Sequence, residues 1–351
     1  MSGGVDSSVA AFLMKADGYD CVGCTMKLYH NEDIGVSRTH TCCSLDDIED
    51  ARAVAYRLGM PYHVFNFSDD FRQKVIEQFV RSYEEGLTPN PCIDCNRYMK
   101  FDKLFERAEV LGCDDVVTGH YARIEKKNGR FLLKKAIDLT EDQSYVLYAM
   151  TQKQLAHTRF PLGGLSKTQV RRIAEEQRFI NAAKPDSQDI CFVPDGDYMR
   201  FMERYTGKTY PIGDFLDENG NVVGHHCGAT QFTIGQRKGL GLAMGAPVYV
   251  FDKNMEKNTI SVGEEKLLYK RSLMAMDMNW IAFDTPPNTF RAKAKTRYRQ
   301  VEQPATVTVM DNGKIKLVFD EPQRAITPGQ AVVLYEDNTV LGGGTILKAV
   351  K

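Results

Sequence analysis

The chain has 351 residues, 43% of them hydrophobic, and a formal net charge of −1 at pH 7. This length suffices for two or three domains with separate cores. No run approaches the roughly 18 consecutive apolar residues of a membrane span, and no secretion signal begins the chain, so we expect a cytoplasmic protein without a membrane partner. The near-zero charge excludes a globally basic nucleic-acid-binding protein, so any RNA contact needs locally gathered cations.

The first 199 residues are predicted to form one α/β domain. Apolar residues at helical spacing cover 46–58, Gly59 ends this helix, and the strand-like run 62–67 follows. The same order of helix, glycine and short valine-rich strand recurs over 101–118. It is typical of βα units that build a parallel sheet.

Beyond about residue 200, turn residues become dense and the strands short. Asn312-Gly313 separates the alternating runs 305–310 and 314–319, which predicts a hairpin. Further strands are predicted over 331–336 and 340–348. The expected fold class is α/β, with a parallel-sheet nucleotide-binding domain, a small connecting domain and a C-terminal β-barrel. Their predicted bounds are 1–199, 200–268 and 269–351.

A glycine- and serine-rich string at residues 2–8 opens the first predicted helix. The glycines let the backbone approach a ligand, and amides at a helix N-terminus attract phosphate. Asp6 can hold Mg²⁺. We therefore predict an ATP-binding loop made of Ser2, Gly3, Gly4, Val5, Asp6, Ser7 and Ser8.

Two alternatives bear on this loop. The string could instead be only a capped helix that follows a glycine turn. It is not a Walker loop, because the Gly-Lys-Ser/Thr ending is missing. Such a loop normally follows a central strand, for which no residues precede Met1. Either the natural protein begins upstream or its sheet lacks this strand, and of the two we expect an upstream segment.

The nine cysteines are unevenly spaced and do not suggest a secreted disulfide framework. Cys92 and Cys95 stand three apart before a predicted helix, whose N-terminus, with Arg97 or Lys100, would favour the Cys95 thiolate. Cys191 is the third thiol of interest. Structural zinc is the weaker interpretation, because no second Cys/His pair has zinc-ribbon spacing. The other cysteines are expected to be small buried or structural residues: Cys21, Cys24, Cys42, Cys43, Cys113 and Cys227.

Six strings resemble, in the same order, those of the bacterial tRNA-specific 2-thiouridylases of the PP-loop ATP pyrophosphatase superfamily. Besides the phosphate loop at residues 2–8, they are Asn90-Pro91-Cys92-Ile93-Asp94-Cys95-Asn96, Thr118-Gly119-His120-Tyr121-Ala122, Asp142-Gln143-Ser144-Tyr145, Asp186-Ser187-Gln188-Asp189-Ile190-Cys191-Phe192 and Thr233-Ile234-Gly235-Gln236-Arg237-Lys238-Gly239-Leu240. The resemblance covers nearly the whole chain.

The resemblance implies that ATP adenylates the C2 oxygen of the wobble uridine of tRNA and that sulfur displaces AMP. It implies a persulfide on Cys191 and a partner nucleophile at Cys95, with a Cys95–Cys191 disulfide as one product. Asp6 is also expected to be a catalytic residue, because adenylation and sulfur transfer both need the nucleotide. The sulfur is expected to come from a sulfur-relay protein or a cysteine desulfurase.

The resemblance also implies ligand contacts. Met26 and Gly119 match nucleotide-contacting positions. The expected tRNA contacts are Asn90, Pro91, Cys92, His120, Glu141, Asp142, Gln143, Arg297, Tyr298 and Gln330.

Cys92 departs from the family, many members of which carry aspartate there. With Cys95 and Cys191 it would offer three thiolates to a [4Fe–4S] cluster whose open iron could bind hydrosulfide. The persulfide and cluster routes both stay open on the sequence.

Five cations occupy the odd positions 291 to 299, in a segment without acidic residues. On one strand they would line about 27 Å of a single face, which favours phosphate contact. Ala292, Ala294, Thr296 and Tyr298 would then point into the barrel. Lys167, Arg171 and Arg172 are further basic candidates, as are Gln236-Arg237-Lys238-Gly239.

Two other functions compete. A PP-loop ligase acting on a small molecule would explain the loop but not three placed cysteines. An RNA-binding or iron–sulfur carrier protein with a vestigial nucleotide site would not need the intact string at residues 2–8.

Overall fold

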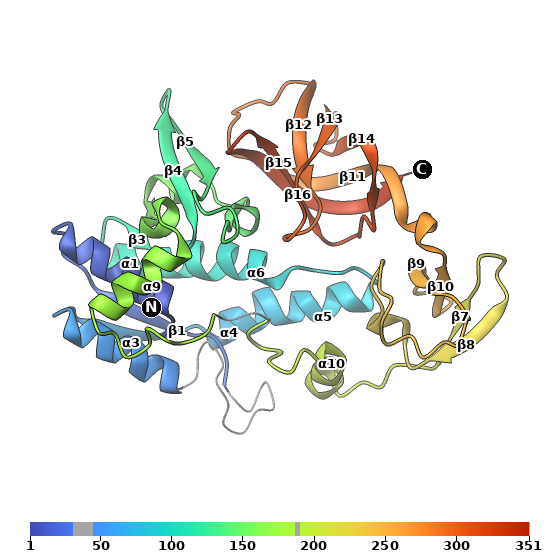
Figure 1. Cartoon of the computed structure of the whole chain (residues 1–351), viewed down its shortest axis with the longest axis horizontal. Coiled ribbons are helices and arrows are strands. Elements are labelled where there is room, and N and C mark those ends of the chain that lie inside the picture. Colours follow the sequence, from blue (N-terminus) through green and yellow to red (C-terminus); the bar gives the residue numbers. More distant parts are fainter. Residues whose placement is uncertain (31–44, 187–189, 351) are drawn as a thin grey trace. The chain divides into compact units, whose positions relative to one another are not determined.

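The protein is represented by a computed structural model that describes residues 1–30, 45–186 and 190–350 (Figure 1). It contains two compact units. The first comprises residues 1–76, 91–198 and 338–340, and the second residues 77–90, 199–337 and 341–351. The second unit includes both smaller predicted domains, and the division into three domains stays a prediction. Cys42 and Cys43 lie outside the described residues.

Parallel strand pairs form the framework of the first unit, as the βα pattern predicts. β1 (Gly23–Lys27) pairs with β2 (Tyr62–Asn66), and β3 (Val116–Val117) pairs with β6 (Thr158–Arg159). β4 (Ala122–Lys127) and β5 (Arg130–Lys135) form an antiparallel hairpin, and β5 also pairs with Thr339.

Helices pack around these strands, and α1 begins directly after the glycines of the phosphate loop. The helices of the first unit are α1 (Val5–Ala16), α3 (Leu45–Arg57), α4 (Ser68–Phe71), η1 (Arg72–Ile76), α6 (Pro91–Asp94), η2 (Cys95–Lys103), α7 (Leu104–Val110), η3 (Ser144–Leu147), α8 (Gln152–Ala156), η4 (Pro161–Gly164), α9 (Lys167–Glu176) and the start of α10 (Tyr198–Thr206). A core that includes Val9, Val54, Tyr121, Leu162 and Val170 joins α1, α3 and α9. It fixes the first turn of α1 against its neighbours.

The helix expected over 101–111 begins ten residues earlier. Pro91 starts α6, η2 continues it as a π-helix, and α7 completes it. Proline suits the first helical turn, because its missing N–H has no acceptor there. Cys95 therefore follows a complete helical turn, and the helix N-terminus that was predicted to favour its thiolate lies nearer Cys92.

The central part of the second unit is a four-stranded sheet in the order β8-β7-β10-β9. Its strands are β7 (Gly213–Leu216), β8 (Val222–His226), β9 (Tyr249–Asn254) and β10 (Thr259–Gly263). Phe215, Val250 and Ile260 are fully buried in its core. α5 (Glu77–Glu84) belongs to this unit and meets α10 through Phe79 and Phe201, whose ring centroids are 6.4 Å apart.

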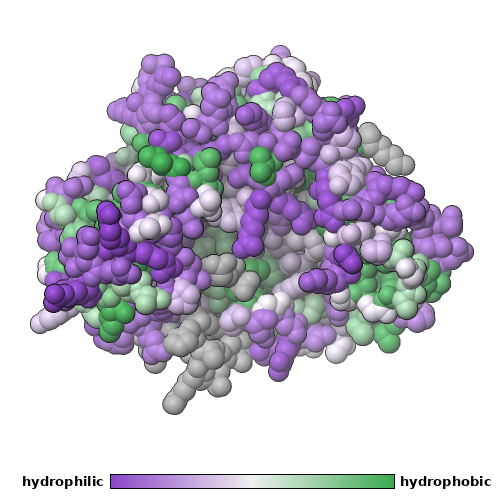
Figure 2. Space-filling view, viewed as in Figure 1, coloured by the Kyte–Doolittle hydropathy of each residue, from purple (hydrophilic) through white to green (hydrophobic). Residues whose placement is uncertain are grey.

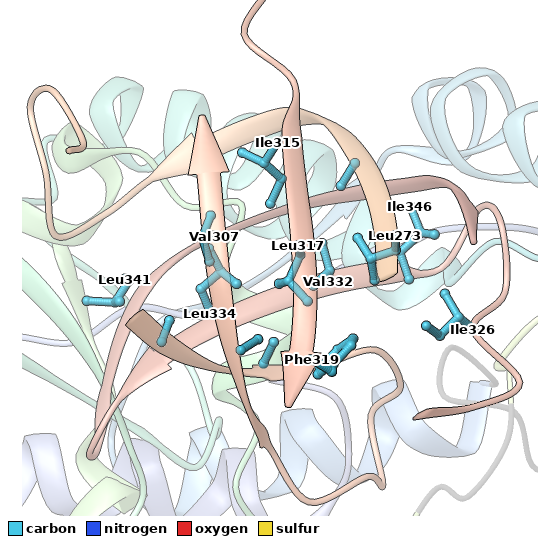
Figure 3. Packing of buried hydrophobic residues seen from close by; sticks show 14 residues of the cluster. Leu273, Val307, Ile315, Leu317, Phe319, Ile326, Val332, Leu334, Leu341 and Ile346 are labelled. Atoms are coloured by element: carbon cyan, nitrogen blue, oxygen red, sulfur yellow. The ribbon is translucent and has the colours of Figure 1, made fainter. Parts of the chain in front are cut away.

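Six strands close a barrel in the order β11-β14-β13-β12-β15-β16, with β11 also paired to β16. They are β11 (Tyr269–Trp280), β12 (Thr289–Lys295), β13 (Gln303–Val309), β14 (Ile315–Arg324), β15 (Ala331–Glu336) and β16 (Thr339–Val350). The predicted hairpin is confirmed as β13 and β14, with Gly313 at φ 75° in its turn. Alternate side chains such as Leu317 and Phe319 point into the barrel (Figure 3).

The basic strand is shorter than predicted. β12 ends at Lys295, and Thr296 then binds Gln300 through its N–H and its hydroxyl, which turns the chain. Tyr298 is consequently 37% exposed, so its predicted place inside the barrel is wrong. Ala292 and Ala294 are buried as expected.

Three of the five cations in this segment face other groups of the protein: Arg291, Lys295 and Arg297, the last of which donates to Ile234 O and Ala325 O. Arg291 forms a bidentate ion pair with Asp320 of β14, at 2.6 and 2.7 Å. Lys295 lies 5.8 Å from the ring centroid of Tyr335. A local sequence window could not anticipate this, because Asp320 arrives from another strand. The continuous line of cations therefore does not form.

Figure 2 shows a mostly hydrophilic surface on one face, with scattered hydrophobic patches. Within residues 1–30, 45–186 and 190–350, no helix is long and apolar enough to cross a membrane. Cys227 is exposed, and Cys21, Cys24 and Cys113 are half-buried, so the expectation that these four thiols are buried is wrong.

Removing a large side chain from the barrel core is expected to be costly. Phe319→Ala should lower the free energy of unfolding of the barrel by about 3–5 kcal/mol, since it leaves a cavity among fully packed neighbours. Urea titration followed by tryptophan fluorescence measures this, because Trp280 lies on β11. Lys316→Ala, on the exposed face of the same strand, should change little. Equal effects of both substitutions would contradict the packing described here.

Candidate active site

The phosphate loop is shaped by its two glycines. Gly3 has φ 71°, and a Cβ there would lie 2.4 Å from the carbonyl oxygen of Asp47. Gly4 is extended and caps α1, so the first amides of the helix have no intrahelical acceptor. Ser7 Oγ donates to Gly4 O at 3.0 Å and accepts from the Ser2 N–H at 3.1 Å. The structure therefore brings the predicted loop residues into one turn that presents amides and hydroxyls.

Gly119 approaches this turn closely. It follows β3, and a Cβ on it would lie 2.7 Å from the carbonyl carbon of Asp6 and 2.8 Å from the Ser7 nitrogen. The predicted Met26 is half-buried near the end of β1. Both residues stand at the C-terminal ends of parallel strands, where ligands bind in open α/β sheets.

Asp6 is the centre of a charged network beside the loop. Lys167 Nζ lies 2.8 Å from each Asp6 carboxylate oxygen and 2.7 Å from Asp186 Oδ1. Tyr121 donates its hydroxyl to Asp6 Oδ1 at 2.9 Å, and burial together with Asp6 raises the pKa of this phenol. Arg171 NH2 contacts Asp186 at 3.2 Å. Lys167 and Arg171, held as candidates for RNA contact, thus face carboxylates instead.

Other residues that the sequence did not single out support the loop. Asn181 donates to Gly3 O and to Ser8 Oγ, both at 2.9 Å. Lys184 Nζ forms an ion pair with Asp47 Oδ1 at 2.6 Å. Asp47 is also the residue whose backbone Gly3 approaches. Asn181 and Lys184 occupy irregular chain without a motif, so only the structure reveals them.

His120 is buried, with 7% of its surface exposed. Its Nδ1 lies 2.8 Å from Thr118 Oγ1 and its Nε2 lies 3.3 Å from Lys100 Nζ. Burial, with Lys100 beside the ring, holds its pKa well below the ordinary value. The neutral ring of His120 can hold the Lys100 ammonium in position. The contact of His120 with tRNA stays a prediction.

Side chains of the Glu141–Gln143 segment accept hydrogen bonds from backbone groups of neighbouring segments. Asp142 accepts hydrogen bonds from the Ala136 N–H and from Ser144. Gln143 Oε1 accepts from the Tyr121 N–H at 2.9 Å. Glu141 has a raised pKa because burial outweighs Lys167. Asp142 and Gln143 therefore fix the chain around Tyr121, and their contact with tRNA stays a prediction.

The three cysteines of interest come from two segments of the first unit. Cys92 is exposed, while Cys95 and Cys191 are half-buried. Tyr29 donates its hydroxyl to Cys191 O at 2.9 Å. Cys95 begins η2, and the residues between Asp186 and Ile190 lie outside the described part of the chain.

Both cysteine segments pack around α4. Phe71 of α4 contacts Tyr29 and Phe192, with ring centroids 6.0 and 5.7 Å apart. Lys103 of η2 lies 3.5 Å from Asp70 of the same helix. The fold thus anchors the Cys95 helix and the Cys191 segment on one short helix.

The same thiols do not form a metal site in this conformation. Across the described part of the chain, no three His, Cys, Asp or Glu side chains are grouped closely enough to hold a metal ion. A [4Fe–4S] cluster needs at least three such ligands together. The cluster route through Cys92, Cys95 and Cys191 stays a prediction beside the persulfide route.

Arg297 and Gln330, two of the predicted contacts in the second unit, bind mainly backbone carbonyls. Arg297 donates to Ile234 O and Ala325 O and to Thr327 Oγ1, at 2.9, 3.2 and 2.7 Å. Gln330 donates to the carbonyl of Thr88 at 2.9 Å, two residues before Asn90. Their tRNA contacts stay predictions. Tyr298 is at the surface, where a base or ribose can reach it.

Comparison with known proteins decides the family. A family model described as the tRNA methyl transferase HUP domain matches residues 1–195, the tRNA methyl transferase PRC-barrel domain matches 199–264, and the aminomethyltransferase beta-barrel domain matches 270–346. The chain is 49% identical to the tRNA-specific 2-thiouridylase MnmA of Clostridioides difficile, over 100% of this chain and 97% of that protein. The chain belongs to the tRNA-specific 2-thiouridylase family. The MnmA proteins of Carboxydothermus hydrogenoformans (48%, covering 99% and 96%) and Symbiobacterium thermophilum (49%, covering 100% and 91%) are similar to it as well.

Membership of the 2-thiouridylase family confirms the resemblance seen in the six strings. It also answers both competing interpretations, since the relatives are named as enzymes that act on tRNA. The fold class is confirmed too, by the HUP domain and the closed barrel.

Adding one methyl group at residue 119 should disable the nucleotide site. Gly119→Ala places a Cβ against rigid backbone at 2.7 Å, so the phosphate loop must shift, and ATP affinity should fall by at least about tenfold, or roughly 1.4 kcal/mol. Isothermal titration with ATP measures this. Gly164→Ala is the control, because nothing lies within 4 Å of a Cβ there. Unchanged ATP affinity in Gly119→Ala would place the nucleotide elsewhere.

The half-buried carboxyl of Asp94, between Cys92 and Cys95, should make stability depend on pH. Burial raises the pKa of Asp94 from 3.8 to about 6, against the Arg97 guanidinium, which lowers it. The folded state then binds more protons than the unfolded state between about pH 4 and 6, so this group destabilises the fold as pH rises through that window. Asp94→Asn should therefore raise the melting temperature above pH 6 and leave it unchanged near pH 4. The opposite pH dependence would refute the burial of this carboxyl.

Proposed function

We propose that the protein catalyses the ATP-dependent 2-thiolation of the wobble uridine of tRNA. The observation that carries this proposal is the phosphate loop packed against Gly119 with Asp6 beside it, in a chain of the 2-thiouridylase family. tRNA and ATP are its substrates, and we place its action in the cytoplasm, where both are present.

The first step activates the base. The C2 oxygen of uridine attacks the α-phosphorus of ATP, the bond to the β-phosphate oxygen breaks, and pyrophosphate leaves. The amides at the head of α1 stabilise the charge that develops on the phosphates. Asp6 is a suitable ligand for Mg²⁺, because this ion is held by one or two carboxylates together with phosphate oxygens. Bound Mg²⁺ neutralises negative charge on the triphosphate.

The second step transfers sulfur. The terminal sulfur of a persulfide on Cys191 attacks C2, and the C2–O bond breaks to release AMP. The Cys95 thiolate then attacks Cys191 Sγ, the former persulfide bond breaks, and its electron pair stays on the sulfur of the 2-thiouridine. A Cys95–Cys191 disulfide remains, and a thiol reductant supplies the two electrons that reset it. A sulfur-relay protein or a cysteine desulfurase supplies the persulfide sulfur.

For tRNA binding, exposed side chains of the second unit are the better candidates. Arg237 and Lys238 project from the turn that follows Thr233, and Tyr298 and Arg299 are exposed beyond β12. Cations of this kind contact phosphates, and an exposed aromatic ring can stack on a base. We propose these residues in place of the continuous basic strand.

Separating the two steps tests the mechanism. Cys191→Ser should abolish 2-thiouridine formation and retain pyrophosphate release stimulated by unmodified tRNA, because its hydroxyl cannot carry a persulfide. Mass spectrometry of digested tRNA and a pyrophosphate assay measure the two steps. Cys113→Ser is the matched control and should retain both.

Two outcomes would count against the proposal. Loss of pyrophosphate release in Cys191→Ser would show that the thiol also serves activation. Pyrophosphate release by the wild-type enzyme that no tRNA stimulates would favour a ligase acting on a small molecule.

A further inference from the structure

Lys167 stands at an electrostatically unfavourable place. It is the first residue of α9, whose N-terminal end carries a partial positive charge and favours acidic side chains. The helix is already capped by Ser166 and Gln169, and Asp138 accepts a hydrogen bond from the Lys167 N–H. Helix stability therefore does not explain a lysine at this position.

Neighbouring carboxylates hold the Lys167 side chain. Nζ makes three contacts of 2.7–2.8 Å with Asp6 and Asp186, and the side chain is only 14% exposed. It also lies 5.4 Å from the ring centroid of Tyr121. Asp186 has a second cation in Arg171, so it would stay paired if Lys167 moved.

We propose that Lys167 is a phosphate-binding residue of the nucleotide site, held on Asp6 and Asp186 until ATP arrives. When Mg²⁺ and ATP bind, Asp6 exchanges the ammonium for Mg²⁺, and Nζ turns to a non-bridging phosphate oxygen. A lysine side chain can make this movement because it is a flexible point charge with four rotatable bonds.

The exchange keeps charge balanced throughout. Asp6, Asp186 and Glu141 surround Lys167 before binding, and the raised pKa of Glu141 reflects burial together with these neighbours. Removing the ammonium without a replacement cation would leave Asp6 unpaired beside the acidic groups. Mg²⁺ and ATP should therefore bind cooperatively, and this cooperativity should depend on Lys167. The inference rests on the proposed function only in that ATP is the nucleotide.

The test compares ATP with adenosine, which has no phosphate. Lys167→Met should weaken Mg²⁺–ATP binding about 10–100-fold, the loss expected for one charged hydrogen bond, and change adenosine binding less than about twofold. Isothermal titration of the full chain without tRNA measures both. Arg172→Met, on the same helix and paired with Glu176, is the control and should match the wild type.

Two further variants keep the test decisive if Lys167→Met folds poorly. Lys167→Arg retains the charge and should restore ATP affinity to within about threefold. Asp186→Asn removes one anchor of the ammonium and should leave ATP binding equal or tighter. Equal loss of ATP and adenosine binding in Lys167→Met, or no loss of either, would overturn the inference alone. Failure of the wild type to bind ATP would overturn both this inference and the proposed function.

Discussion

The close approach of Gly119 to the backbone of Asp6 and Ser7 is the constraint on which the nucleotide site depends. It places the end of β3 against the first turn of α1, so that the amides at the head of the helix and the carboxylate of Asp6 face one ligand position. Gly3 makes the matching approach to Asp47. No other residue type fits at either contact, because a Cβ would meet backbone atoms that cannot rotate away. The shape of the site therefore depends on glycine at positions 3 and 119 as well as on the side chains that surround it.

Around this contact, acidic side chains alternate with lysine side chains. Lys167 joins Asp6 to Asp186, and Lys184 joins Asp47 to Asp50. Each cation reaches from the segment after α8 back to the loop or to α3, so the charge network also fixes the tertiary packing. A buried charge without a partner is expensive, and this network therefore resists rearrangement until another cation replaces one of its members.

Local patterns predicted the framework well. The helical spacing over 46–58 corresponds to α3, and Asn312-Gly313 corresponds to the turn between β13 and β14, because these signals depend on neighbours in sequence. The environment of the predicted basic residues was not predictable in the same way. Arg291 meets Asp320 from another strand, and Arg297 turns toward Ile234 and Ala325, which are far away in the chain. Side chains whose partners come from distant segments cannot be assigned from a window of sequence.

The surroundings of the cysteines also depend on contacts between segments that are distant in the chain. The family resemblance marked Cys95 and Cys191 as a pair, and in the structure Phe71 and Asp70 of α4 contact the two segments that carry them. In the mechanism that we propose, each of these segments keeps its attachment to α4 while sulfur is transferred and the Cys95–Cys191 disulfide forms. Both segments thus share α4 as an attachment, which is compatible with the sulfur relay that we propose.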